Sequence, residues 1–105
     1  MKTINVANDF TRFPSGRYAQ NGDTSGEAFR QRFLEPAIKN REEITIQLDG
    51  TIGYGSSFLE EAFGGLVRTL RIPASELFPL LHLDTRDTAL LAEVEGYIRE
   101  ASLNL

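Results

Sequence analysis

The segment 44–70 joins the pattern of a strand to the pattern of a helix through a glycine-rich turn. Ile44, Ile46 and Leu48 alternate with polar residues, which is the period of a half-buried strand. Glycines between 50 and 55 then allow the backbone angles of a tight turn. Behind the turn, apolar residues recur at steps of three and four, as on one stripe of a helix: Phe58, Leu59, Ala62, Phe63, Leu66, Val67 and Leu70. The segment therefore predicts a strand over 43–49 and a helix over 56–71.

The same two patterns recur on both sides of this segment. Alternation predicts strands over 2–7 and 80–84, and apolar spacing predicts helices over 25–40 and 87–102. Arg17–Tyr18 is a candidate for a further short strand. Because strands that alternate with helices favour a parallel sheet with right-handed crossovers, we predict an α/β fold. A chain of 105 residues has the size of one domain, so we expect a single domain over 1–105.

Three local signals refine these elements. Thr24 and Glu27 have the spacing of a capping box, in which each side chain binds a backbone N–H at the start of a helix. Pro36 must kink the first predicted helix or end it early, because proline lacks the N–H and crowds the preceding turn. We interpret the rings of Phe10 and Phe13 as anchors that hold their loop to the core.

The composition excludes several kinds of site. The chain has no cysteine and one histidine, His82, so it forms neither a disulfide nor a cysteine or multi-histidine metal site. We predict no metal and no cofactor. The formal net charge of −4 argues against a general nucleic-acid binder, which usually has a basic face. No apolar run reaches membrane-spanning length and the N-terminus lacks a signal-peptide pattern, which favours a cytoplasmic protein with no membrane contact.

The turn at 53–57 lacks the residues of known catalytic and phosphate-binding loops. No lysine follows the glycines, as a P-loop requires, and no glycine stands two places after the serine, as in a nucleophile elbow. A Ser-His-Asp triad would need His82, which the pattern places in or beside a buried strand. Without a base and nucleophile pair, we predict that the protein is not an enzyme.

Ser56 and Ser57 stand where the central helix begins, and the sequence supports two interpretations. Either hydroxyl suits an N-cap, because serine is a preferred residue there. Alternatively, an exposed serine at this place is a phosphorylation candidate, since phosphate adds about 1.5–2 negative charges at the positive end of a helix. A partner that docks on the same helix face would have to desolvate that charge. Phosphorylation would therefore weaken partner binding and act as a switch.

Two doublets in the predicted central helix bear on these interpretations. Glu60–Glu61 places negative charge beside the serines and disfavours phosphate there, unless Arg17, Arg68 and Arg71 fold nearby. Inside a helix, each glycine of Gly64–Gly65 destabilises the fold by about 0.5–1 kcal/mol relative to alanine. We therefore expect that a contact at this place requires the absence of a side chain. That contact is either close packing against a neighbouring helix or the sheet, or the docking of a partner on a smooth exposed face.

Several blocks of the sequence resemble a known family. Residues 44–68 resemble the central strand, turn and helix of STAS domains, the fold of anti-sigma-factor antagonists. A more specific resemblance, over about residues 8–85, is to the STAS-like family of unknown function called DUF4325. It rests on Gly16-Arg-Tyr18, Ser25-Gly-Glu-Ala-Phe-Arg30 and Tyr54-Gly-Ser-Ser-Phe-Leu-Glu-Glu-Ala-Phe-Gly-Gly-Leu-Val-Arg68. The resemblance implies a four- to five-stranded mixed, mainly parallel sheet with helices packed on it.

The resemblance also implies partner switching, in which a GHKL-type kinase phosphorylates the hydroxyl of the turn and so controls binding to that kinase or to another regulator. Carried over residue by residue, Ser57 matches the phosphorylated position and Ser56 the hydroxyl before it. Gly55 stands where the STAS pattern has an aspartate, and Phe58 where it has a glycine.

We therefore predict a non-enzymatic regulatory module that binds a protein partner, with Ser57 as the first and Ser56 as the second candidate for phosphorylation. Two alternatives stay open: a nucleotide or small-anion sensor at the Gly53–Ser57 turn, and a host-interacting or structural protein of a mobile element. The oligomeric state stays open as well. The residues predicted to contact an anion or a partner are Asp49, Gly53, Tyr54, Gly55, Phe58, Glu61, Gly64, Gly65 and Arg68, with Arg17 and Tyr18 as accessory residues.

Overall fold

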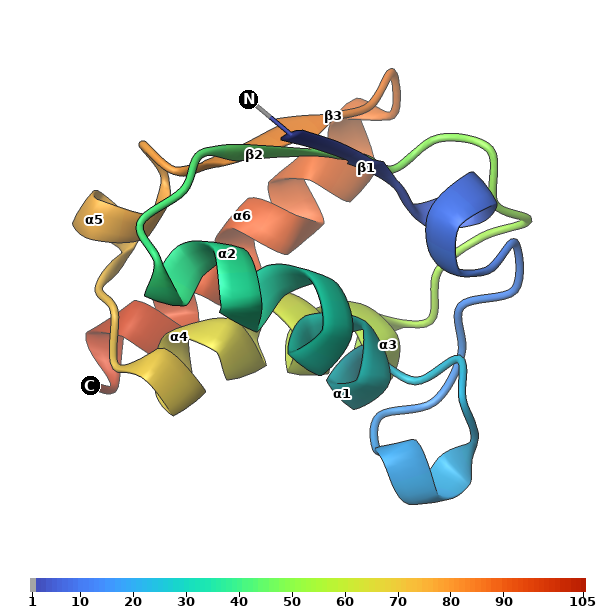
Figure 1. The fold of residues 1–105 in the computed structure, drawn as a ribbon, viewed down its shortest axis with the longest axis horizontal. Coiled ribbons are helices and arrows are strands. Elements are labelled where there is room, and N and C mark those ends of the chain that lie inside the picture. Colours follow the sequence, from blue (N-terminus) through green and yellow to red (C-terminus); the bar gives the residue numbers. More distant parts are fainter. Residues whose placement is uncertain (1) are drawn as a thin grey trace.

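The computed structural model describes residues 2–105. Its three strands, β1 (Lys2–Asn5), β2 (Ile44–Gln47) and β3 (Leu81–Asp84), form one parallel sheet in that order (Figure 1). Ile4 lies opposite Ile46, and Ile46 lies opposite Leu83. The α/β class and the parallel pairing predicted from the alternation are confirmed.

The described residues form three strands, all parallel, instead of the four or five strands of a mixed sheet. Arg17–Tyr18, the candidate for a further strand, lies in a loop before the 3-10 turn Ala19–Asn21. The carbonyl of Arg17 accepts a hydrogen bond from the N–H of Glu27 at 3.0 Å. The N–H of Tyr18 donates to the side chain of Asn21 at 3.1 Å. These backbone groups are therefore used by a helix start and a turn, and not by a strand ladder.

Two long helices each contain a π-helical turn, and a third is regular throughout. The first runs through α1 (Gly26–Phe29), the π turn Arg30–Leu34 and α2 (Glu35–Lys39). The central helix runs through α3 (Ser56–Leu59), the π turn Glu60–Gly64 and α4 (Gly65–Leu70). The remaining helical elements are α5 (Ala74–Leu77), α6 (Thr88–Leu103) and the π turn Val6–Phe10 after β1. No helix in the described part of the chain is long and apolar enough to cross a membrane.

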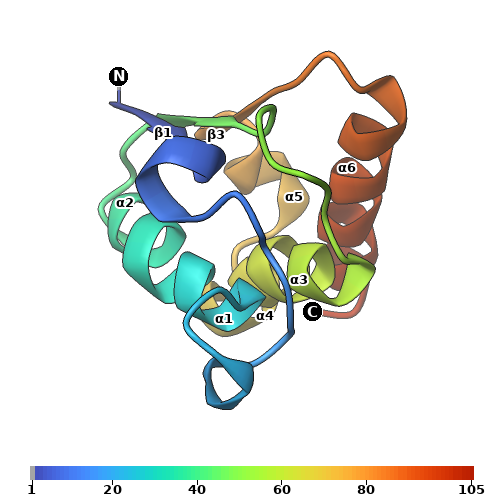
Figure 2. The ribbon, with the colours of Figure 1, turned by 90° about the vertical axis from the view of Figure 1, so that its right-hand side faces the viewer.

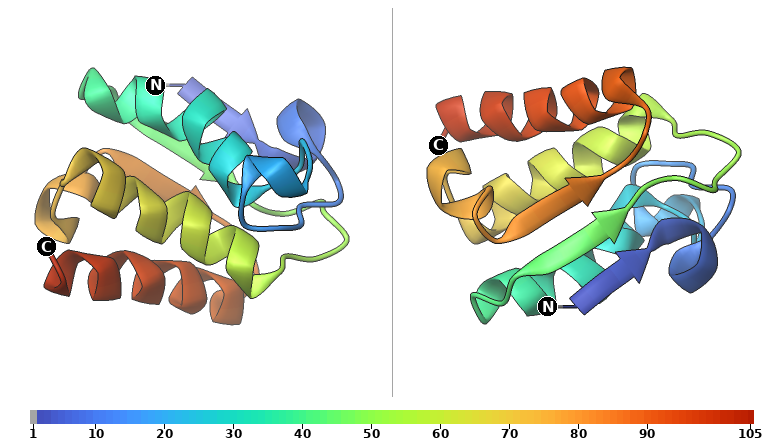
Figure 3. Two further views of the ribbon diagram at one scale, coloured as in Figure 1. Left: turned by 90° about the horizontal axis from the view of Figure 1, so that it is seen from below. Right: turned by 90° about the horizontal axis from the view of Figure 1, so that it is seen from above.

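The long helices all lie on one face of the sheet, and the other face is bare (Figure 1). Seen from below, the central helix lies between α1–α2 and α6 (Figure 3). Ile44 and Ile46 of β2 are buried between the sheet and this layer. His82, opposite Thr45 in the ladder, alternates with buried Leu81 and belongs to the bare face. The sheet is therefore the outer layer of a two-layer molecule.

The central helix is the most deeply buried of the long helices. Phe58 and Phe63 have no exposed area. Rings from other segments pack around them: the ring centroid of Phe58 lies 5.9 Å from that of Phe29 and 6.4 Å from that of Phe10. The predicted anchoring role is confirmed for Phe10. It is wrong for Phe13, which is 60% exposed in the bend that follows the π turn.

The capping box predicted at Thr24 is wrong by one residue. Ser25 is the N-cap of α1, and its hydroxyl accepts from the N–H of Ala28 at 3.1 Å. Glu27 accepts instead from the N–H of Ala19 at 2.7 Å, because the preceding loop folds back over the start of the helix. The spacing of Thr24 and Glu27 does not reveal that this loop folds back. The prediction therefore placed the N-cap one residue too early.

Pro36 does not end the first helix, which continues to Lys39. The π turn Arg30–Leu34 precedes it, and there the N–H of Glu35 donates to the carbonyl of Arg30, five residues back. A widened turn changes where the preceding carbonyls point, and this is how the helix accommodates a ring that would crowd a regular turn.

Candidate functional site

Ser56 and Ser57 are the first two residues of α3, and both are exposed. The N-cap is Gly55, which has extended backbone angles and makes no side-chain capping bond. The interpretation of the serines as caps is therefore wrong by one position. Their hydroxyls lie at the surface, at the helix end that presents free N–H groups and the positive end of the dipole.

The turn before α3 depends on two of its glycines for its shape. Gly50 has φ 101° and Gly53 has φ 143°, both in the region that favours glycine. Gly55 has φ −73°, which any residue adopts. The N–H of Ile52 donates to the carbonyl of Arg12 at 3.0 Å. The turn is thus tied to the N-terminal segment, which crosses the same side of the molecule (Figure 2).

Tyr54 anchors the end of this turn to the sheet and to the central helix. Its hydroxyl donates to the carbonyl of Leu48 at 2.7 Å, and its ring centroid lies 5.9 Å from that of Phe58. Burial raises the pKa of Tyr54 to about 12. The side chain therefore stays neutral at physiological pH and acts as a structural support for the start of α3.

Asp49 links the end of β2 to the loop that precedes α6. One carboxylate oxygen accepts from the hydroxyl of Thr85 at 2.6 Å, and the other accepts from the N–H of Arg86 at 3.1 Å. Because both oxygens are engaged by neighbouring groups, Asp49 holds two loops at the carboxyl edge of the sheet together.

Four of the predicted contact residues lie beneath the surface. Phe58 has no exposed area, Glu61 is 8% exposed, and Gly64 and Gly65 are both buried. They therefore offer little or no surface to a partner docked on the folded domain. They shape the helix whose exposed start carries the serines.

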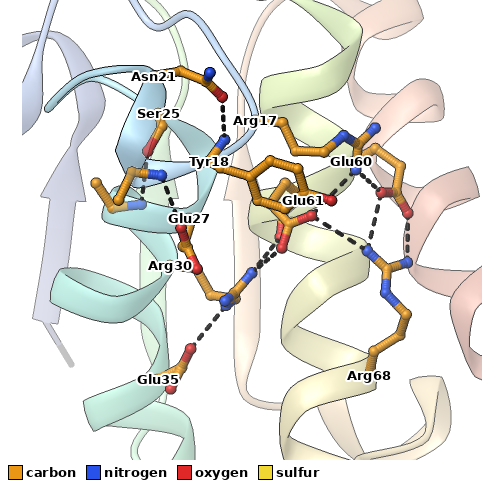
Figure 4. A network of polar contacts seen from close by, with 12 residues as sticks. Arg17, Tyr18, Asn21, Ser25, Glu27, Arg30, Glu35, Glu60, Glu61 and Arg68 are labelled. Carbon is orange, nitrogen blue, oxygen red and sulfur yellow. Dashed lines mark hydrogen bonds and ion pairs between the residues drawn. The ribbon is translucent and has the colours of Figure 1, made fainter.

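A network of charged side chains joins α1–α2 to the central helix and to the loop before α1 (Figure 4). Arg30 is at its centre and is 5% exposed. It pairs with the carboxylate of Glu61, and its Nε lies 2.8 Å from the carboxylate of Glu35. Its Nη1 also donates to the carbonyl of Glu61 at 3.1 Å. The charge of this buried guanidinium is thus balanced by two carboxylates, as burial requires.

The outer part of the network surrounds Glu60. Its Oε1 lies 2.6 Å from Arg17 Nη1, and its Oε2 lies 2.6 Å from Arg68 Nη1. Hydrogen bonds from Arg68, and then from Arg17, lower the pKa of Glu60. Arg17 also approaches Glu61 at 3.2 Å. Two of the arginines predicted to offset the glutamates do so; Arg71 is an exposed left-handed C-cap with no ion pair in the described part of the chain.

The network explains the glycine doublet. A Cβ on Gly65 would lie 2.5 Å from Arg30 Nη1, and a Cβ on Gly64 would lie 2.5 Å from Glu60 Oε2. The missing side chains therefore make room for the ion pairs that cross the helix surface. Of the two reasons left open for Gly64–Gly65, close packing is the one that the structure shows.

Arg30 and Glu35 are members of this network that the sequence pattern did not indicate. Arg30 lies in the first predicted helix next to Phe29, and nothing in its own spacing predicts burial. The glycine doublet was the usable signal, because two glycines inside a helix indicate that something large lies against them.

His82 lies away from the serines, on the bare face of the sheet. Its Nε2 lies 2.9 Å from the carboxylate of Glu43. The helix layer, in which α3 begins with Ser56 and Ser57, covers the opposite face (Figure 1). The structure therefore brings no histidine to the serines. Residues 2–105 also contain no group of three or more side chains that could hold a metal ion.

A cleft of about 350 Å³ lies between the turn after β2 and the first turns of α6. Its walls include Asp49, Ile52 and Tyr54 from the turn and Asp87 and Glu93 from the α6 side. The turn that forms one wall leads directly into α3, so Tyr54 of the cleft is two residues before Ser56.

The comparison with protein families agrees with this architecture. The family described as a STAS-like domain of unknown function (DUF4325) matches residues 25–81. The chain belongs to this family. No curated protein and no solved structure matches the chain. The matched range runs from the N-cap of α1 to the first residue of β3. This STAS-like domain therefore has its two long neighbouring helices inside the family's range, while Arg17 and α6 lie outside it.

Proposed function

We propose that this STAS-like domain is a non-enzymatic regulatory module that binds a protein partner through the surface around the start of α3, and that phosphorylation of Ser57 controls the binding. The observation that carries the proposal is the exposure of Ser56 and Ser57 at a helix start capped by Gly55. Their hydroxyls have no capping role, so modification would leave the fold intact.

Exposed apolar residues on the turn before α3 and on the N-terminal segment bonded to it support a contact surface. Ile52 is 71% exposed and Phe13 is 60% exposed. The hydrogen bond from the N–H of Ile52 to the carbonyl of Arg12 brings their two loops together. Large apolar side chains that gather on neighbouring loops are typical of a surface that a partner covers.

The charge network supports phosphorylation next to a pair of glutamates. Glu60 is paired with Arg17 and Arg68, and Glu61 is paired with Arg30. Their negative charges are thus compensated before a phosphate is added. The phosphate would gain from the positive end of the helix, whereas a docked partner would have to desolvate it.

The test is phosphorylation by a GHKL-type kinase encoded beside the gene. We expect mass spectrometry to find phosphate on Ser57 of the wild type and none on Ser57→Ala. Ser57→Asp should bind that kinase about tenfold more weakly than the wild type, since a buried extra charge is unfavourable by 1 kcal/mol or more. Ser75→Asp, which changes an exposed serine of α5, should bind as the wild type does.

Two results together would rule out the switch: no phosphate on the serines of α3, and unchanged binding by Ser57→Asp. Retained binding would then support a constitutive interaction module. Loss of kinase binding by both aspartate variants would instead show that the site is not specific to α3.

The surroundings of the turn disfavour the alternative of an anion or nucleotide sensor. Asp49, Asp87 and Glu93 line the cleft beside the turn and would repel a phosphate group. A thermal-shift screen with nucleotides and phosphorylated metabolites tests this alternative, and we expect no stabilisation at millimolar ligand.

A further inference from the structure

The cleft between the turn and α6 combines an apolar lining with acidic side chains. Ile52, Tyr54 and Leu90 contribute apolar groups, and Asp49, Asp87 and Glu93 contribute carboxylates. Ile52 is 71% exposed, although it is as large as the residues of the core. A hollow with an exposed apolar wall and convergent charged groups has the composition of a binding site.

These carboxylates differ from the glutamates of the charge network in having no cationic partner. Glu60 and Glu61 pair with arginines, as described above. Among residues 2–105, Asp49, Asp87 and Glu93 are in no ion pair. Their contacts are hydrogen bonds to neutral donors, such as that from Tyr97 to Glu93 at 2.7 Å. The cleft therefore has negative charge that the domain itself does not neutralise.

An adjoining hollow of about 810 Å³ extends the same charge pattern along the carboxyl edge of the sheet. It shares Asp49 and Asp87 with the cleft and adds Asp84. Arg86 is the cation among its lining residues, against three carboxylates. The whole edge is thus complementary in charge to a basic partner and repels nucleic acid.

We propose that the cleft binds a short segment of a partner protein in which an arginine or lysine flanks one bulky apolar side chain. The apolar side chain would lie against Ile52 and Leu90, and the cation would lie between Asp87 and Glu93. This inference rests on the proposed function, because it names the chemistry of the partner that the same side of the domain binds. A bare metal ion fits less well, since the apolar side chains of the wall would provide it with no ligands.

The test uses three synthetic peptides of equal length that differ at their centre: Arg-Leu-Arg, Glu-Leu-Glu and Arg-Ser-Arg. Each is titrated into ¹⁵N-labelled protein and followed by two-dimensional NMR. We expect the Arg-Leu-Arg peptide to shift the amides of 49–54 and 87–93 in a saturable way. The acidic peptide should shift none of them, and the peptide without leucine should bind about tenfold more weakly, as the loss of one buried leucine predicts.

Matched variants separate the two parts of the cleft. Glu93→Gln keeps an acceptor for Tyr97 but removes the charge, and it should weaken binding about two- to fivefold, with a smaller effect of salt. Ile52→Ser should weaken binding about tenfold. Leu103→Ser, which changes an 86% exposed side chain near the end of α6, should bind as the wild type does.

Three results would overturn the proposal: no saturable shifts with Arg-Leu-Arg at millimolar peptide, shifts outside the cleft, or equal binding of the acidic or leucine-free peptide. Failure of the proposed function would be seen separately. If Ser57→Asp leaves kinase binding unchanged while the cleft binds its peptide, the switch fails and the cleft stands. If Ser57→Asp weakens kinase binding while the cleft binds no peptide, the cleft proposal alone fails.

Discussion

At the scale of the residue, Gly64 and Gly65 are neighbours in sequence with different surroundings. A Cβ on Gly65 would meet Arg30 Nη1 at 2.5 Å and Glu61 Oε2 at 3.0 Å. Those atoms belong to a buried ion pair whose partners have little freedom to move. A Cβ on Gly64 would meet Glu60 and Arg68, whose side chains are 26% and 45% exposed. These can swing outward into solvent.

This contrast predicts effects of different size for the same substitution at the two adjacent positions. Gly65→Ala should lower the free energy of unfolding by about 1–3 kcal/mol, because it displaces Arg30 from Glu61. Gly64→Ala should change it by less than about 1 kcal/mol, because alanine favours the helix and the displaced side chains remain solvated. Urea unfolding followed by circular dichroism measures both. Equal losses in the two variants would contradict this account of the doublet.

At the scale of the element, the approach of the first helix to the central helix is set at Gly26. A Cβ there would lie 2.4 Å from the carbonyl oxygen of Phe58 and 3.1 Å from the backbone N of Ala62. These are backbone atoms, so the conflict cannot be relieved by rotating a side chain. The two helices must separate, and the pairing of Arg30 with Glu61 depends on their distance.

Gly26→Ala should therefore be among the most damaging single substitutions, lowering the free energy of unfolding by about 3 kcal/mol. Gly96→Ala is the matched control, since Gly96 is exposed in α6 and a Cβ there would meet nothing within 4 Å. It should raise the free energy of unfolding by about 0.5–1 kcal/mol. Thermal unfolding of the two variants and the wild type measures these changes. A Gly26→Ala variant as stable as the wild type would show that the two helices are not so closely packed in solution.

At the scale of the whole molecule, the ion network connects the loop before α1 with both long helices. Arg17 comes from that loop, Arg30 from the first helix, and Glu60 and Arg68 from the central helix. Protonation of one carboxylate should therefore loosen contacts between several segments. The pKa of Glu60 is lowered in the folded state by Arg68 and then by Arg17.

A lowered pKa in the folded state means that Glu60 stabilises the fold above its unfolded pKa, and that this contribution is lost as pH falls through the folded pKa. The ordinary value is 4.5. We expect the wild type to be more stable than Glu60→Gln at neutral pH, with the difference shrinking below about pH 4.5. Urea unfolding from pH 7 to pH 3 measures this. Glu100→Gln, which changes an exposed residue of α6, should follow the wild type, and a difference for Glu60→Gln that is constant with pH would refute the linkage.

Much of the fold could be predicted because its signals are local. The alternation of Ile44 and Ile46 and the spacing of Phe58, Phe63 and Leu66 identify a strand and a helix from neighbouring residues alone. The errors occur where a distant segment supplies a bonding partner. The N-cap moved from Thr24 to Ser25 because the loop folds back, and the predicted strand at Arg17–Tyr18 is absent because a helix start uses its carbonyl.

The sequence by itself determined the α/β class, the order of the elements, the buried stripe of the central helix and the place of the exposed serines within a turn-to-helix junction. Only the tertiary structure decided that Gly55 is the cap, that Arg30 reaches Glu61 across 31 positions of sequence, and that the turn and α6 enclose an acidic cleft. The physical reason is the distance in sequence over which each kind of interaction acts. Periodicity and propensity depend on neighbouring residues, whereas an ion pair or a cleft depends on how distant segments approach one another. For the pair of Arg30 with Glu61, that approach is set by the absence of a single Cβ at Gly26.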